Sequence, residues 1–171
     1  MDNTIIETMN NWSFINELFG NKKPVKRKTE VEWKWPVGRA SIDDVKYIEN
    51  TIGLKLPIDY LKIAMKYNYA RPMPNTIMPG KEVFNNLITL SRKDENSMVE
   101  IYKFVSESAS NLIVPFATDP AGNYFCFKYK DSRDRNPVVV FWDHENWNAP
   151  VNSLKVLAKS FTDLVSKLYE P

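Results

Sequence analysis

The chain has 171 residues, of which 43% are hydrophobic and 13% aromatic, so it fits one globular domain and excludes a disordered composition. Its formal net charge of +2 gives no overall electrostatic reason to bind nucleic acid or an anionic membrane. One cysteine and one histidine exclude an internal disulfide, a multi-cysteine zinc site and a two-histidine metal centre. Any mechanism that needs imidazole would therefore use His144.

The charge is unevenly distributed along the chain. Residues 21–40 carry seven basic and two acidic side chains, a net charge of +5, and the remainder is −3. The basic residues of this stretch are Lys22, Lys23, Lys26, Arg27, Lys28, Lys34 and Arg39. We predict that residues 1–40 form an N-terminal helix and a basic connector, packed on a domain of residues 41–171.

The first half of the chain predicts three helices. Apolar residues at helical spacing over residues 5–19 predict an amphipathic helix. Ser41 opens a second helix that stops at Gly53, and Pro57 begins a third. The apolar side of this third helix consists of Tyr60, Leu61, Ala64 and Met65. Three prolines within residues 71–80 predict a loop without regular structure.

The second half predicts strands and two helices. Ser97 and Glu100 form a capping box for one helix, and Pro115 places its strand at a sheet edge or a bulge. The predicted strands cover residues 87–90, 112–117, 124–129 and 138–142, and the last two form a hairpin. The chain ends in a helix at about residues 161–168. The fold class is therefore α+β, with a mainly antiparallel sheet flanked by helices.

The densest polar cluster follows the last predicted strand directly. It is the tripeptide of Asp143, His144 and Glu145, and Asp119 and Asn123 lie near it if their strands pair. One interpretation is a carboxylate–imidazole metal site or an acid/base pair. The other is turn chemistry, in which Asp and Asn side chains bond to nearby backbone N–H groups. We favour the turn interpretation and predict no catalytic residue and no metal.

Two other patterns allow a chemical and a structural interpretation. Cys126 lies between two phenylalanines in a strand, where a cysteine is usually a buried hydrophobe and not a nucleophile. Trp33 and Trp35 alternate with charges, as in a strip for nucleic acid or in an edge strand packed on the domain. We favour packing, and therefore no direct nucleic-acid binding. The phosphate-binding loop, the GxSxG elbow and the HExxH motif are absent from the sequence, so we predict no cofactor.

Several segments, in order, resemble the SUKH superfamily, the domain of the Smi/Knr cell-wall regulators of yeast and of many bacterial toxin-immunity proteins. The matching segments cover residues 48–49, 53–60, 111–119, 122–126, 140–145 and 160–165. In that family the first long helix often ends in Asn-Gly, whereas this chain has Asn68 followed by Tyr69. The resemblance implies an α+β binding module, in which the segment from Trp142 to Glu145 is a fold signature and part of the partner-facing cleft.

The resemblance also implies a function. The leading interpretation is an immunity protein that binds and neutralises the toxic domain, such as a nuclease, of a cognate bacterial toxin. A regulatory or scaffold module is the alternative, and a metal-dependent or acid/base enzyme is the least favoured. The N-terminus lacks a signal peptide pattern and no apolar run is long enough to span a membrane, so we expect a cytoplasmic protein. The candidate partner-binding residues are Asp119, Asp131, Arg133, Asp134, Arg135, Asp143, His144, Glu145 and Trp147.

Overall fold

The computed structural model describes residues 30–77, 79, 82–146 and 154–170, and the predicted helix of residues 5–19 lies outside them. The described elements, in chain order, are β1 (Glu32–Lys34), α2 (Ile42–Ile52), α3 (Ile58–Ala64), β2 (Arg71–Met73), β3 (Thr76–Ile77), α4 (Met98–Ser108), β4 (Ile113–Thr118), β5 (Tyr124–Lys128), β6 (Val138–Trp142), the short 3-10 helix η1 (His144–Asn146), β7 (Lys155–Ala158), α5 (Phe161–Ser166) and β8 (Leu168–Tyr169).

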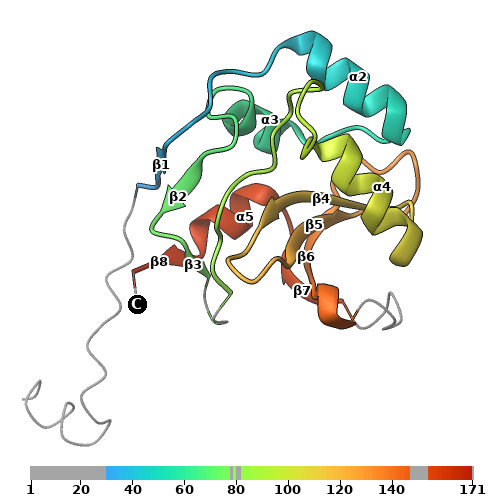
Figure 1. Cartoon of the computed structure of the whole chain (residues 1–171). Helices are drawn as coiled ribbons and strands as arrows, with labels where there is room; N and C mark the ends of the chain where they lie inside the picture. The colour runs from blue at the N-terminus through green and yellow to red at the C-terminus, as the bar shows by residue number, and fades with distance from the viewer. Residues whose placement is uncertain (1–29, 78, 80–81, 147–153, 171) are drawn as a thin grey trace, which may run out of the picture.

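A four-stranded antiparallel sheet in the order β4-β5-β6-β7 forms the centre of the molecule (Figure 1). The predicted hairpin is present, because β5 pairs with β6 from Tyr124 opposite Trp142 to Lys128 opposite Val138. β4 is an edge strand, and its register shifts after Pro115, as expected for a proline in a sheet. The predicted α+β fold with a mainly antiparallel sheet and flanking helices is confirmed.

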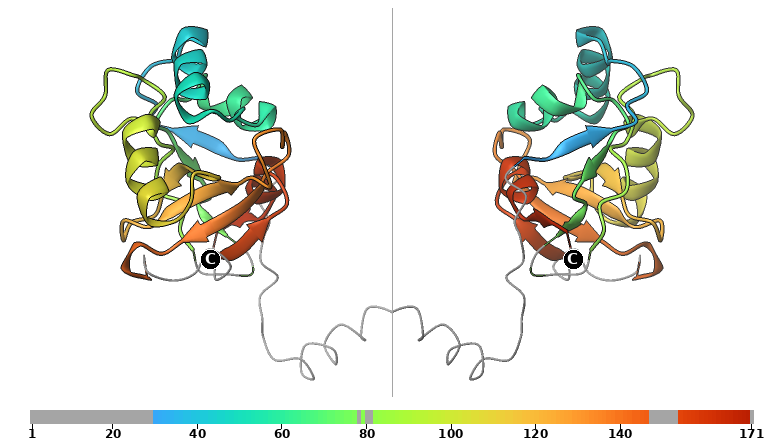
Figure 2. Two further views of the ribbon diagram at one scale, coloured as in Figure 1. Left: turned by 90° about the vertical axis from the view of Figure 1, so that its right-hand side faces the viewer. Right: turned by 90° about the vertical axis from the view of Figure 1, so that its left-hand side faces the viewer.

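Helices cover both faces of this sheet. Figure 2 shows α4 on one side of the sheet and α5 on the other. The side chains of β5 alternate accordingly: Phe125 and Phe127 belong to a large apolar cluster that includes Phe161 of α5. Cys126 points to a smaller cluster that includes Val105 of α4. Burial on both faces explains why these strands are so rich in apolar residues.

Aromatic rings fill the centre of the larger cluster. The rings of Phe116 and Phe127 stack with centroids 4.2 Å apart. The Tyr60 ring of α3 meets them edge-on at 5.6 and 5.3 Å, and the Phe161 ring of α5 lies 5.7 Å from that of Phe116. These contacts join α3, α5 and the sheet in one core, and edge-to-face pairs add stability beyond the buried area.

The helix caps differ partly from the prediction. α2 begins with a full capping box, in which the Ser41 hydroxyl accepts a bond from the Asp44 N–H and the Asp44 carboxylate accepts one from the Ser41 N–H. The capping box predicted at Ser97 is wrong, because the Ser97 side chain makes no capping bond. Glu100 instead bonds to Lys103 at 2.8 Å on the exposed side of α4.

Three further predictions are corrected by long-range pairing. Within the predicted loop of residues 71–80, β2 pairs with β1 and β3 pairs with β8. Pro72 is tolerated there because β2 pairs on one side only. The predicted strand of residues 87–90 is only an extended segment along β4, with an isolated bridge between Leu87 and Ala117. The predicted C-terminal helix ends at Ser166, where the chain turns into β8.

The turn after α3 lies where the SUKH superfamily, which the sequence resembles, often has Asn-Gly. Asn68 is buried, and its side chain accepts a bond from the Leu90 N–H at 2.9 Å and donates one to Thr89 at 3.2 Å. Tyr69, which occupies the glycine position, has a φ of 63°, in the left-handed region. The backbone therefore keeps a conformation suited to glycine although the side chain is tyrosine.

We expect Tyr69→Gly to raise the free energy of unfolding by up to about 1 kcal/mol, because it removes left-handed strain that exceeds the entropy cost of glycine. Tyr69 is 44% exposed, so its removal costs less packing than the removal of a buried tyrosine. Urea unfolding measures the change, with Tyr47→Gly, within α2, as a control that should be destabilised. A loss of stability in Tyr69→Gly would show that the strain is smaller than the lost contacts.

Buried phenols make the fold sensitive to alkaline pH. Burial raises the pKa of Tyr60 and of Tyr129 above the ordinary value of 10.0. The Tyr129 hydroxyl donates to the Lys55 carbonyl at 2.8 Å, whereas the Tyr60 hydroxyl is buried and has no partner among the described residues. A phenol whose pKa is raised on folding stabilises the fold below pH 10, and this stability is lost as the unfolded chain ionises above pH 10.

Above pH 10, the free energy of unfolding of Tyr60→Phe should therefore fall less steeply with pH than that of the parent chain. The difference in slope approaches about 1.4 kcal/mol per pH unit, the value for one proton. Below pH 9 the variant should be at least as stable as the parent, because the lost hydroxyl has no described partner. Denaturant unfolding between pH 7 and pH 11 measures both effects, with the exposed Tyr47→Phe as the matched control. Equal slopes for the two variants would contradict this prediction.

Candidate functional site

The polar cluster predicted around His144 forms at one end of the central sheet, where the β4–β5 turn meets η1. Asp119 organises the turn, because its Oδ1 accepts bonds from the N–H groups of Ala121 and Asn123 at 2.9 and 2.7 Å. Asp119 Oδ2 accepts a bond from Asn123 Nδ2 at 2.8 Å. Asn123 Oδ1 in turn accepts from the His144 backbone N–H at 3.1 Å and lies 2.8 Å from His144 Nδ1. The structure thus brings Asp119, Asn123 and His144 together.

This network determines which nitrogen of His144 carries a proton. A carboxylate only accepts hydrogen bonds, so the amide nitrogen of Asn123 must face Asp119 and its oxygen must face His144. His144 Nδ1 is then the donor in the 2.8 Å contact. The neutral ring is therefore protonated on Nδ1, and Nε2 remains as its acceptor.

The turn between β4 and β5 also brings the backbone close to this ring. Gly122 has a φ of 89°, a conformation that side chains rarely adopt. A Cβ built on Gly122 would lie 3.7 Å from His144 Cε1, an ordinary van der Waals distance, so the positive φ and not a lack of space favours glycine here. The glycine is needed for the backbone turn that presents Asn123 to His144.

These contacts support the turn interpretation of the cluster. Both oxygens of Asp119 already accept bonds from the turn, and Asp143 Oδ1 accepts the Glu145 N–H at 3.0 Å. Across residues 30–77, 79, 82–146 and 154–170, no three His, Cys, Asp or Glu side chains are grouped so that they could hold a metal ion. The Glu145 side chain is exposed and remains accessible to a partner.

The β5–β6 loop holds the other candidate residues. Asp131 accepts the Arg133 N–H at 2.7 Å, and Asp134 accepts the N–H groups of Lys130 at 3.0 Å and Asn136 at 2.9 Å. Burial opposes ionisation of Asp134, but the bonds from these two N–H groups outweigh it and hold its pKa below the ordinary value. The two aspartates therefore shape the loop.

Two arginines of the same loop are exposed. Arg135 bonds to the carbonyls of Ser132 and Asp134, both at 3.2 Å, and Arg133 is exposed. Arg135 also lines a hollow of about 370 Å³ together with Lys62 of α3 and Phe161 of α5. Arg135, one of the predicted site residues, thus borders a cavity.

The candidate residues fall into two groups at opposite ends of the sheet. Tyr124, next to the His144 cluster, pairs with Trp142, whereas Lys128, next to the loop, pairs with Val138. Five residues of strand separate the ends by about 16 Å. The intervening Phe125, Cys126 and Phe127 are fully buried, so no continuous surface along β5 joins the two groups. Trp147, the remaining candidate, lies outside the described residues.

Cys126 has the environment of a core residue. It is fully buried, and burial raises the pKa of its thiol. A thiolate is the nucleophilic form of cysteine, so this environment opposes a role in catalysis. The prediction that Cys126 is a buried hydrophobe is confirmed.

The tryptophans of the connector have different environments. Trp33 packs on Phe84 and Phe161, with ring centroids 6.1 and 6.2 Å away, and β1 is the edge strand that was predicted. Trp35 is 66% exposed, so the expectation that both tryptophans pack on the domain is wrong for Trp35. Its φ of 55° turns the chain at the end of β1, and the Arg71 guanidinium lies 5.8 Å from its ring.

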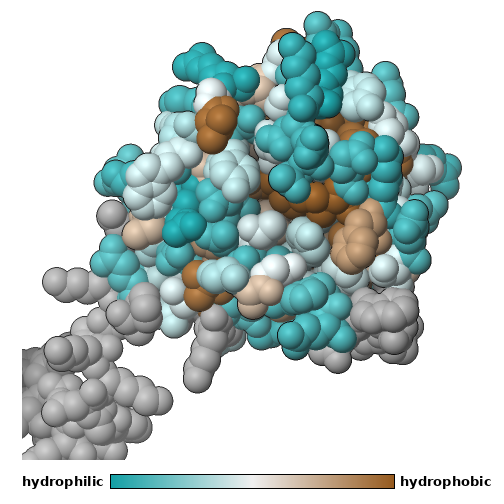
Figure 3. All heavy atoms as spheres, viewed as in Figure 1, coloured by the Kyte–Doolittle hydropathy of each residue, from teal (hydrophilic) through white to brown (hydrophobic). Residues whose placement is uncertain are grey.

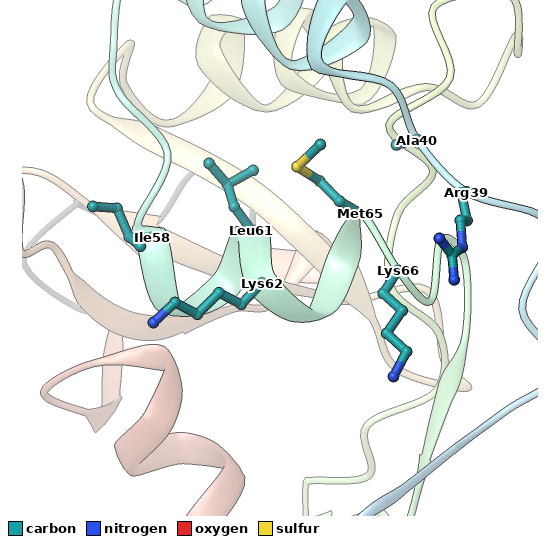
Figure 4. Close-up of a pocket in the computed structure, with 7 residues that line it drawn as sticks. All are labelled: Arg39, Ala40, Ile58, Leu61, Lys62, Met65 and Lys66. Carbon is teal, nitrogen blue, oxygen red and sulfur yellow. The ribbon is translucent and has the colours of Figure 1, made fainter.

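A second surface, along α3, was missed by sequence reasoning. A groove of about 450 Å³ is lined by Arg39, Ala40, Ile58, Leu61, Lys62, Met65 and Lys66 (Figure 4), and we call it the α3 groove. Ile58 is 73% exposed. Figure 3 shows a mostly hydrophilic face with separate hydrophobic patches. Among the large hydrophobic side chains of the described residues, that of Ile58 is the most exposed. The sequence does contain one indication of this surface, because Ile58 is apolar but lies off the apolar side predicted for its helix.

In the part of the chain that the structure describes, none of the helices combines the length and apolar character needed to cross a membrane.

The protein is thus a small α+β domain, and its His144 cluster stabilises a turn at one end of the central sheet. Residues 39–167 match the model of the SMI1 / KNR4 family (SUKH-1), well over half of the chain. The chain therefore belongs to this family. The comparison with curated proteins returned no match.

Proposed function

We propose that this chain is a cytoplasmic immunity protein that binds and neutralises the toxic domain, such as a nuclease, of a cognate bacterial toxin. Membership of the SMI1 / KNR4 family (SUKH-1) carries the proposal, since proteins of this family are commonly immunity proteins and generally non-catalytic. In this proposal the contacts of His144 with Asn123 fix the shape of a turn that faces the partner. A regulatory or scaffold module that binds a cellular protein is the alternative.

Partner binding is proposed for the two groups of candidate residues described above, together with Trp147. The groups differ in charge. The His144 end presents Asp143 and Glu145, whereas the loop end combines two aspartates with Arg133 and Arg135. A basic toxin such as a nuclease would be attracted to the acidic His144 end, because opposite fields accelerate association.

Co-expression tests the function itself. The toxin domain encoded next to this gene should kill cells when expressed alone and leave them viable when this chain is present. The two proteins should also co-purify as a complex. Protection without a complex, or a complex only with cellular proteins, would contradict the immunity function, and the second result would favour the regulatory module.

Charge reversal tests the binding end. Glu145→Lys should slow association with the toxin domain about 3- to 10-fold at low ionic strength, because it removes attraction at the acidic end. The effect should fall as salt is added, since salt screens exposed charges. Arg133→Glu, an exposed reversal at the opposite end, is the matched control and should not slow association. Stopped-flow or biosensor kinetics measure the association rates of both variants. A larger effect of Arg133→Glu would indicate that the interface lies at the loop end.

A further inference from the structure

The α3 groove has an apolar side and a basic side. Ile58, Leu61 and Met65 lie in a row along one side of α3 and the turn after it, and Lys62 and Lys66 project on the adjacent side (Figure 4). Their spacings of three and four residues place each row on one face of a helix. Arg39 closes one end of the groove from the segment before α2.

The cations of the groove have no acidic partner among the described residues. Arg39, Lys62 and Lys66 form no salt bridge within residues 30–77, 79, 82–146 and 154–170. No acidic side chain of these described residues lines the groove. Asp59, the nearest acid in sequence, is occupied by the N–H and hydroxyl of Thr162 at 2.8 and 2.9 Å. The groove therefore fits an occupant that has an apolar side and an adjacent acidic side.

The first twenty residues of this chain have that composition. They contain the acids Asp2, Glu7 and Glu17 and no lysine or arginine. Their apolar residues recur at helical spacing and are Ile5, Met9, Trp12, Ile15 and Phe19. An amphipathic helix needs an apolar surface to be stable in water, because short isolated helices are marginal. The segment and the groove are thus complementary in both charge and polarity.

The connector is long enough to bring the segment to the groove. Glu30 is the first described residue, and nine residues along the chain lead from it to Arg39 at the groove. Ten residues lead back from Glu30 to Gly20, where the predicted helix ends. Each residue of an extended chain spans the same maximum distance. The ten residues from Glu30 back to Gly20 can therefore cover at least the distance that the nine residues from Glu30 to Arg39 cover.

We propose that residues 5–19 dock as an amphipathic helix in the α3 groove of the same chain. The apolar face of the segment covers Ile58, Leu61 and Met65, and its acids lie beside Lys62 and Lys66. The proposal concerns a contact within one chain and does not depend on a toxin partner.

Photo-crosslinking of the full chain tests this contact. A photoreactive benzoylphenylalanine replaces Ile58, and a matched control chain carries it in place of Val156 on β7, which is 63% exposed. We expect position 58 to crosslink to peptides within residues 1–20 at least fivefold more than position 156 does. Mixing isotopically labelled with unlabelled chains distinguishes crosslinks within one chain from those between two copies.

Substitutions at positions other than the probe test whether apolar contacts and charge pairs hold the segment in the groove. Trp12→Asp should reduce the crosslink at least fivefold because it places a charge on the apolar face, while the thermal melt of the domain stays within a few degrees. Lys62→Glu with Lys66→Glu should also reduce it, and adding Glu7→Lys and Glu17→Lys should restore it. Equal crosslinking from positions 58 and 156, crosslinks only between copies, or insensitivity to Trp12→Asp would each overturn the proposal.

Discussion

Phe116→Ala should lower the free energy of unfolding by about 3–5 kcal/mol, the usual loss for a fully buried phenylalanine. The side chain lies between the rings of Phe127, Tyr60 and Phe161. Its removal leaves a cavity where α3, α5 and the sheet meet, and rigid strands cannot close this cavity. Since single domains are stable by only about 5–15 kcal/mol, the variant approaches the limit of folding.

Urea unfolding at pH 7 measures this loss, with Phe104→Ala as the matched control. Phe104 is 53% exposed on α4, so the same change in chemistry should cost less than about 1 kcal/mol there. If the two variants lost similar free energy, the aromatic cluster would not be the main source of cohesion between the helices and the sheet.

Asn123→Ala should lower the free energy of unfolding by about 1–3 kcal/mol. The substitution removes one bond to Asp119 and two to His144, and these partly buried groups lose their partners. The loss is smaller than for full burial because water can reach some of the exposed groups. Asn136→Ala, in the exposed β5–β6 loop, is the matched control and should change stability by less than about 0.5 kcal/mol.

The same cluster separates the binding and enzyme interpretations. If the network is structural, His144→Ala should lower the melting temperature, because Asn123 Oδ1 loses its contact with Nδ1. An acid/base enzyme would instead lose its activity while its melting temperature stayed nearly unchanged. Thermal unfolding of His144→Ala beside Asn123→Ala distinguishes the two cases, and an unchanged melting temperature in both variants would contradict the structural role.

The separation of the candidate residues into two ends has a consequence for binding. Because α4 and α5 cover the faces of the sheet, β5 and β6 are largely buried between the two ends, whereas β7 has exposed residues. A partner at the His144 end therefore contacts the loop residues only if it extends around one of these helices or along the exposed residues of β7. Single substitutions at each end consequently report on separate surfaces, and their effects on binding should add when both are combined.

Local patterns in the sequence were sufficient for much of the fold. Apolar periodicity and end signals located α2 between Ser41 and Gly53, and strict alternation located β5. The hairpin followed from two apolar runs joined by a polar loop, and Pro115 correctly marked an edge strand and a register shift. These features depend on neighbouring residues, so a single sequence contains them.

Features that depend on distant residues were not predictable in the same way. β2, β3 and β8 are strands only because they pair with segments far along the chain, and β8 replaces the last turn expected for the final helix. The capping box at Ser97 fitted the motif, yet Glu100 bonds to Lys103 instead. Short motifs with weak local preferences are decided by the tertiary contacts that are available.

The candidate site shows the same division. The single histidine and the single cysteine of the sequence excluded a two-histidine metal centre and an internal disulfide, and alternation placed Cys126 inside a strand. Strand pairing alone brought Asn123 to His144 and put Asp131 and Asp134 at the opposite end. The sequence determined which side chains are present and which face of a strand they occupy. The tertiary structure decided which of them meet, because hydrogen-bond partners and the two ends of a sheet are set by register between strands.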